Sequence, residues 1–183
     1  MSDSKPTACF DATLLQPQGF GGDAPWAFVV LPKEVSNMLS RRGRTTVAVI
    51  VNGRPFQAML EPDGQLSHWL RIPGALMEAA DLKFGSSARF EISALQSEPE
   101  PELPLDLQSA LSSSPEAQQV WRDTSTIARI DWIHWICSAK QAKTRAKRIR
   151  DACEMLAAGK RRVCCFDPSG FYSKALSAPK AID

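Results

Sequence analysis

The sequence contains no long hydrophobic run and no leader-like start. Residues 1–7 carry neither a basic cluster nor the apolar stretch that follows it in a secretion signal. No apolar run approaches the roughly 18 residues that a membrane-spanning helix requires. We therefore expect a protein without a transmembrane segment and place it in the cytoplasm.

Histidine is also scarce, which limits metal and acid–base chemistry. His68 and His134 are the two histidines, and neither has a second ligand at a metal-binding spacing. The glycines at 19, 21 and 22 lack the lysine that follows in a phosphate-binding loop, and no G-x-S-x-G motif occurs. We predict no metal, no cofactor and no catalytic residues, and hence a protein that is not an enzyme.

Paired cysteines and a strong net charge are missing too. The 5 cysteines are odd in number and irregularly spaced, unlike the framework of a secreted disulfide-rich domain, so reduced thiols are the simpler interpretation. The adjacent pair Cys164 and Cys165 could form a disulfide only with a distorted ring, which disfavours a redox role. Because the net charge is only +2, any binding of polyanions would have to come from local clusters of basic residues.

Enough apolar material is nevertheless present for a core, since 44% of the residues are hydrophobic. Residues 8–96 show short apolar runs separated by turn signals such as Asn52-Gly53, which suits a tight β-hairpin, and Asp63-Gly64. This pattern predicts a small N-terminal antiparallel β-barrel with two short helices, one after Pro32 and one after Pro73. The clearest strand candidates cover residues 27–31, 44–51, 56–60, 66–70 and 88–94.

The composition changes at residues 97–104, where glutamates alternate with prolines, and we predict a linker there. Beyond it the hydrophobic periodicity is helical. We predict an all-α module over residues 105–162, followed by an irregular tail over 163–183, and thus an α+β fold class. The expected helices cover 105–111, a stretch starting at Pro115, 126–139 and 141–158. The third is apolar on all sides, and the fourth has an apolar stripe at Ala142, Ala146, Ile149, Cys153 and Leu156.

Residues 132–149 read WIHWICSAKQAKTRAKRI, and they are followed by Leu156 and by Gly159-Lys160. This segment, with the opening Leu-Pro-Leu-Asp-Leu at 103–107, resembles the C-terminal module of the YdeI/OmpD-associated family, named for bacteriocin protection. Residues 26–32, 41–44 and 51–56 resemble the small β-barrel domain of unknown function that often precedes that module. The resemblance implies protection against bacteriocins or cationic antimicrobial peptides and defines no catalytic reaction. Lys143 departs from it, because the family usually has an acidic residue just before Thr-Arg.

The strongest chemical feature is the positive charge of the fourth predicted helix. Its candidates for binding an anion or a partner are Lys140, Lys143, Lys147 and Arg150 along one face, with Arg145 and Arg148 on the opposite flank. Such a surface could bind nucleic acid or an anionic membrane. Alternatively, it is a solvated face balanced by Asp151, three residues after Arg148, by Glu154, four after Arg150, or by the acidic linker. Arg145 borders the apolar stripe, which favours a structural role for it.

A second group of basic residues, Arg41, Arg42 and Arg44, falls at the expected mouth of the barrel, where it could meet a small anion. Three hypotheses remain open. The first is a non-catalytic stress or envelope-protection protein acting through a protein partner. The others are a nucleic-acid-binding regulator using the basic helix and a barrel that binds a small anionic ligand. Trp132 and Trp135 are expected in the core, and an uncovered pair would itself predict a homo-oligomer.

Overall fold

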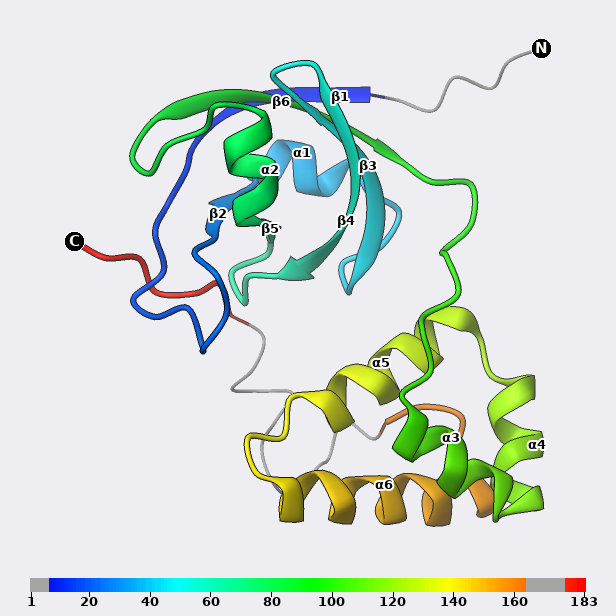
Figure 1. The fold of residues 1–183 in the computed structure, drawn as a ribbon. Coiled ribbons are helices and arrows are strands. Elements are labelled where there is room, and N and C mark those ends of the chain that lie inside the picture. Colours follow the sequence, from blue (N-terminus) through cyan, green and yellow to red (C-terminus); the bar gives the residue numbers. More distant parts are fainter. Residues whose placement is uncertain (1–6, 164–176) are drawn as a thin grey trace. The chain divides into compact units, whose positions relative to one another are not determined.

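The computed structural model describes residues 7–163 and 177–183. They form two compact units, the first made of residues 7–97 with 177–183 and the second of residues 98–163. Strands dominate the first unit and helices the second (Figure 1), so the predicted α+β class is confirmed. None of the described helices is long and apolar enough to cross a membrane.

The first unit contains a six-stranded antiparallel sheet in the order β1-β6-β3-β4-β5-β2. Its edge strands, β1 and β2, share no ladder, and one isolated bridge links Leu15, two residues after the end of β1, to Phe28 of β2. Closure into the predicted barrel is therefore not confirmed. The reason lies in β2, which is only four residues long and stands between Pro25 and Pro32, neither of which can donate to a ladder. The strands are β1 (Thr7–Thr13), β2 (Ala27–Val30), β3 (Thr45–Val51), β4 (Arg54–Pro62), β5 (His68–Ile72) and β6 (Ser87–Ala94).

The β3–β4 hairpin confirms the Asn52-Gly53 prediction, since both residues have positive φ angles, 47° and 74°. The strand predicted over 66–70 is wrong in its bounds, because β5 begins two residues later. The cause is a side chain: Asp63 Oδ1 accepts hydrogen bonds from the backbone amides of Gln65 (2.7 Å) and Ser67 (2.8 Å). These bonds hold residues 63–67 in a turn, in which Leu66 has a φ of 68°.

Alternation along the strands builds the core of the first unit. In β6, Ala88, Phe90 and Ile92 are buried while Arg89 points to solvent. Phe90 stacks on Phe10 of β1, with ring centroids 5.5 Å apart. Two short helices lie beside the sheet (Figure 1), α1 (Lys33–Asn37) and α2 (Gly74–Ala79), both placed after a proline as predicted. They add Val35 and Met77 to the same core.

Four helices form the second unit: α3 (Leu105–Ser112), α4 (Pro115–Asp123), α5 (Thr126–Cys137) and α6 (Ala142–Ala157). Each begins within one residue of its predicted start. Ser125 caps α5 by accepting a hydrogen bond from the Ala128 amide at 3.2 Å. The core that the helices share includes Leu107, Leu111, Trp121, Trp132, Trp135, Ile136, Ile149 and Leu156.

The end of the chain returns to the first unit. Ala181 forms an antiparallel bridge with Pro17, in the loop after β1. The Gln18 amide donates to the Lys180 carbonyl (2.9 Å), and the Ile182 amide donates to the Gln16 carbonyl (2.8 Å). Residues 177–183 thus contain neither helix nor strand, but they are hydrogen-bonded to the first unit. Cys164 and Cys165 lie outside the described residues.

Candidate functional site

Helix α6 was predicted to bury a stripe along its whole length, and the structure corrects this for its first half. Ile149, Ala152 and Leu156 are buried, whereas Ala142 and Ala146 are exposed. Small alanines bury little apolar surface, so the first half packs through two longer side chains instead. These are Arg145 and Arg148, both half-buried.

Arg145 forms a two-pronged ion pair with Asp106 of α3. Its Nε donates to Oδ2 at 2.6 Å and its second terminal nitrogen donates to Oδ1 at 3.0 Å. The hydrogen bonds from Arg145 hold the pKa of the Asp106 carboxyl below its usual range, and they raise the pKa of the guanidinium. Arg145 therefore joins two helices of the module, the structural role that its position on the helix predicts.

Arg148 is tied to the end of α5. It donates to the Trp135 carbonyl at 2.6 Å and to the Ser138 hydroxyl at 3.0 Å. Its guanidinium carbon lies 5.4 Å from the centre of the Trp135 ring. The last carbonyls of a helix have no hydrogen-bond donor within the helix, and Arg148 provides a donor for one of them, that of Trp135. Of the six predicted cations, Arg145 and Arg148 are thus engaged inside the module.

Lys147 is partly neutralised on the surface. Its ammonium group lies 2.6 Å from a carboxylate oxygen of Asp151, one turn along the helix. We had expected Asp151 to balance Arg148. It pairs with Lys147 instead, because the Arg148 side chain turns toward α5. The acidic linker does not dock on α6 through Glu100 either, since Glu100 pairs with Arg129 of α5 at 2.6 Å. That pairing lowers the pKa of the Glu100 carboxyl.

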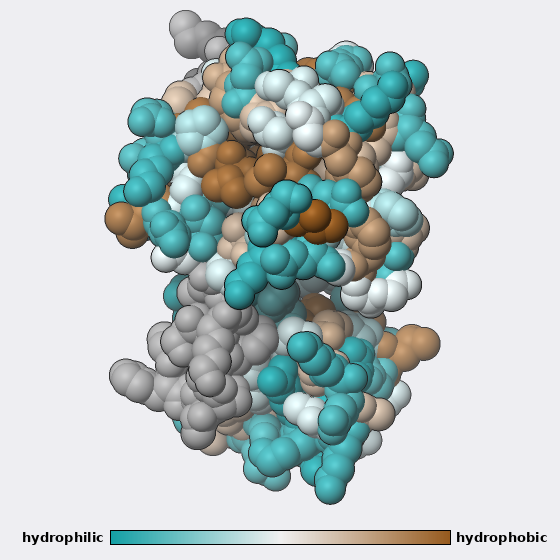
Figure 2. Space-filling model, turned by 90° about the vertical axis from the view of Figure 1, so that its left-hand side faces the viewer, coloured by the Kyte–Doolittle hydropathy of each residue, from teal (hydrophilic) through white to brown (hydrophobic). Residues whose placement is uncertain are grey.

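Of the six predicted cations, three remain on the outside of the module without a carboxylate partner among the described residues: Lys140, Lys143 and Arg150. All three are exposed, and within residues 7–163 and 177–183 they form no ion pair. We call this set the basic face. On the side of the molecule shown in Figure 2, the described atoms of the helical module are mostly hydrophilic, which agrees with a solvated surface.

The three arginines predicted at the barrel mouth do not act together. Arg44 is buried, and its charge together with that of Arg71 opposes the rise that burial causes in the pKa of the Glu61 carboxyl. Arg41 is exposed and lines no pocket among the described ones. Arg42 lines a pocket of about 400 Å³ beside α1 and the start of β5. Only one of the three is therefore placed to meet a small ligand in a cavity.

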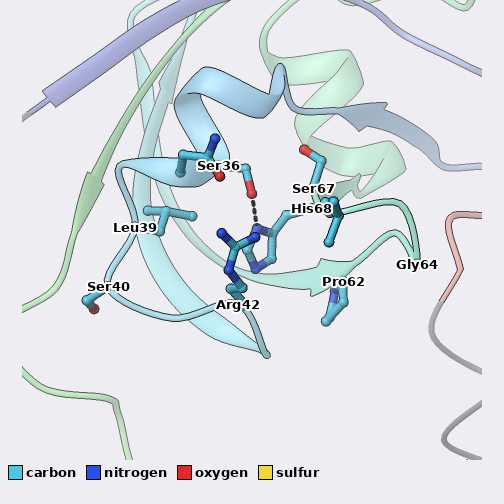
Figure 3. A pocket seen from close by; sticks show the side chains of 10 residues that line it. Ser36, Leu39, Ser40, Arg42, Pro62, Gly64, Ser67 and His68 are labelled. Carbon is cyan, nitrogen blue, oxygen red and sulfur yellow. Dashed lines mark hydrogen bonds between the residues drawn. The ribbon is translucent and has the colours of Figure 1, made fainter.

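The polar residues of this pocket were not predicted. His68 is buried, and its Nδ1 lies 2.6 Å from the Ser36 hydroxyl, while its Nε2 lies 3.0 Å from the Gly43 carbonyl oxygen (Figure 3). Ser36 and His68 are 32 residues apart in the chain, so no local motif joins them. We call the cavity lined by Ser36, Arg42, Ser67 and His68, with their neighbours, the polar pocket. In the described parts of the chain, no group of His, Cys, Asp and Glu side chains is arranged to hold a metal ion.

Comparison with known families agrees with the resemblance drawn from the sequence. Residues 10–92 match a domain of unknown function, DUF1905, which covers the sheet and its two short helices. No curated protein matches the chain. Residues 100–159 match the family described as bacteriocin-protection, YdeI or OmpD-associated, which covers all four helices of the second unit. The chain thus carries a bacteriocin-protection, YdeI or OmpD-associated module preceded by a DUF1905 domain, as its motifs predicted.

Proposed function

We propose that this is a non-catalytic protection protein that binds an acidic surface of another protein through the basic face. The observation that carries the proposal is the set of three exposed cations, Lys140, Lys143 and Arg150, in a module whose family is described by bacteriocin protection. Arginines that hold α6 in place are distinct from these cations, so the face is not a by-product of packing.

The distribution of charge along the chain supports an electrostatic partner. Residues 140–162 contain nine lysines and arginines and two acids, a charge of 9 − 2 = +7. Since the whole chain carries +2, the remaining residues carry 2 − 7 = −5. A field concentrated on one segment steers a partner of opposite charge and speeds its association. A surface whose charges only interact with water needs no such concentration of positive charge in one segment.

The test in cells is complementation of a strain that lacks the gene. We expect the deletion to raise sensitivity to a bacteriocin and to a cationic antimicrobial peptide, and the natural protein to restore resistance. A triple variant with Lys140, Lys143 and Arg150 changed to Gln should restore it poorly. The matched control changes Lys33, Arg54 and Arg89 to Gln, three exposed cations of the first unit, and should restore resistance fully. Unchanged sensitivity of the deletion strain would refute the proposal.

A binding experiment separates the protein partner from other polyanions. The purified chain and the triple variant are titrated with labelled duplex DNA and with anionic phospholipid vesicles over a range of salt concentrations. Contacts with DNA phosphates give a steep salt dependence, with a slope of about −0.9 per phosphate neutralised. We expect the natural chain and the triple variant to behave alike with each probe, so that no binding to DNA or vesicles depends on the basic face. Salt-sensitive DNA binding lost in the variant would replace the proposal with a nucleic-acid regulator, and the same result with vesicles would replace it with a membrane surface.

A further inference from the structure

The floor of the polar pocket is made of buried polar side chains held in fixed positions. Ser67 donates from its hydroxyl to the Leu31 carbonyl at 2.7 Å, while the Leu31 amide donates to the His68 carbonyl at 2.9 Å. Ser36, Ser67 and His68 are 6%, 5% and 1% exposed. Buried polar groups keep one geometry when their partners are satisfied. The floor is therefore preorganised before any ligand arrives.

The hydrogen bonds also fix the orientation of the histidine ring. A carbonyl oxygen can only accept, so Nε2 of His68 carries the proton that it donates to Gly43. In the neutral ring Nδ1 is then an acceptor, and the Ser36 hydroxyl donates to it. The ring is thus held at both of its nitrogens, and the Ser67 hydroxyl is held by the Leu31 carbonyl.

Arg42 supplies the charge of the pocket. It extends from the segment between α1 and β3 toward the Ser36–His68 pair (Figure 3). Its side chain is exposed, and it makes no ion pair with any residue that the structure describes. No acidic residue lines the cavity, and Oδ1 of the nearby Asp63 accepts hydrogen bonds from two backbone amides of the 63–67 turn. A guanidinium over a cavity that no acidic side chain lines favours an anion.

The remaining wall of the pocket is apolar. Leu39, Pro62 and Leu66 line it, and Leu66 is 71% exposed at the tip of its turn. The volume of about 400 Å³ is in the range of small-molecule sites. One cation balances a carboxylate, whereas a phosphate dianion would leave negative charge beside the apolar wall. The cavity thus suits an anion of single charge with an apolar body.

We propose that the polar pocket binds a small carboxylate with an apolar body, whose carboxylate pairs with Arg42 and whose body lies against Leu39, Pro62 and Leu66. The site lies in the first unit and is independent of the function proposed for the basic face. This site also differs from the predicted barrel mouth with three arginines, because only Arg42 takes part in it.

The experiment follows backbone amide signals of the full chain by NMR during titration with benzoate, with the neutral and equally sized benzamide, and with inorganic phosphate at constant ionic strength. We expect benzoate to shift the signals of Ser36, Arg42, Ser67 and His68. Arg42→Gln should weaken benzoate binding at least about tenfold, the loss expected for a charge-assisted pair. Arg41→Gln is the matched control, since it removes the same charge one residue away from an exposed side chain outside the pocket, and it should leave binding unchanged.

Several outcomes would overturn the proposal. Equal shifts with benzamide would show a hollow that binds apolar rings without regard to charge. Tighter binding of phosphate than of benzoate would show a different anion class. No benzoate shift up to its solubility limit, or equal weakening by Arg41→Gln and Arg42→Gln, would remove the site altogether. Because Arg42 is exposed, its variant is expected to fold, and its NMR spectrum verifies this in the same experiment.

Discussion

The guanidinium of Arg145 and the carboxylate of Asp106 meet in two parallel hydrogen bonds across 39 residues of sequence. This pair joins α6 to α3. Arg145 is therefore engaged within the module and is not one of its exposed cations. In a helix rich in lysine and arginine, the structure thus separates side chains that hold the fold from those that are exposed to solvent.

Asp106→Asn is expected to lower the free energy of unfolding of the helical module by roughly 0.5–1 kcal/mol, because the pair is partly solvent-exposed and screened. Urea unfolding of the single variants and of the double variant with Arg145→Gln gives the coupling energy between the two side chains. A coupling near zero would mean that the pair contributes nothing to stability.

The same pair predicts a pH dependence. The pKa of Asp106 is lowered in the folded protein, so its contribution is complete above the ordinary aspartate pKa of about 3.9 and is lost as the pH falls through the lowered value. The stability difference between the natural protein and Asp106→Asn should therefore be constant from neutral pH down to about 5 and then shrink. A difference that grows on acidification would contradict this linkage.

Trp132→Ala is expected to destabilise the helical module strongly. Trp132 is 0% exposed, and its indole nitrogen donates to the Arg161 carbonyl at 3.3 Å. Removing so large a buried side chain leaves a cavity and costs about 3–5 kcal/mol. Chemical denaturation followed by circular dichroism measures the loss. Leu105→Ala, at a position 80% exposed, is the control and should change stability little.

Gly74→Ala is expected to destabilise the first unit. A Cβ atom at this first residue of α2 would collide with the backbone carbonyl oxygen of Pro25, which cannot move without shifting β2. Overpacking of this kind costs roughly 1–3 kcal/mol. Gly19→Ala, where a Cβ would meet nothing, is the matched control. Equal melting temperatures for both variants would argue against the close approach of α2 to Pro25.

Ending the chain after residue 176 should weaken the first unit selectively. The truncation removes two backbone hydrogen bonds to the loop after β1, worth about 1–3 kcal/mol together. Amide hydrogen exchange should therefore speed up at Gln18, whose amide donates to the Lys180 carbonyl, and stay unchanged at Leu107 and Trp132. Unaltered exchange at Gln18 would mean that the terminal bridge does not protect this loop.

Elements that local chemistry determines could be predicted from the sequence. The Asn52-Gly53 turn, the helix after Pro115 and the alternation in β6 each follow from the conformational preferences of a few neighbouring residues. The start of β5 could not, because it depends on where the Asp63 side chain finds its donors. Closure of the predicted barrel is not confirmed, because a single isolated bridge links β2 to the segment after β1. A run of apolar residues does not reveal which partner a short edge strand finds.

The candidate sites were predictable in part. Periodicity placed Lys143, Arg145, Lys147, Arg148 and Arg150 on the correct helix, whereas Lys140 lies before its first residue. It could not show that Arg148 reaches the end of α5. The polar pocket was missed because Ser36 and His68 come together only through the packing of α1 beside β5. Contacts between distant segments leave no mark on the local pattern of a single sequence.

The hydrogen bonds between residues 180–182 and the loop after β1 have a consequence for synthesis on the ribosome. Most of the first unit precedes the helical module in the sequence, yet some of its backbone contacts come from residues 180–182, which follow that module. During elongation domains fold as units, the earliest first, so this one must wait in an incomplete form while the helical module is made. Emergence of residues 180–182, rather than that of the first 97 residues, is then the moment from which these contacts of the unit can form.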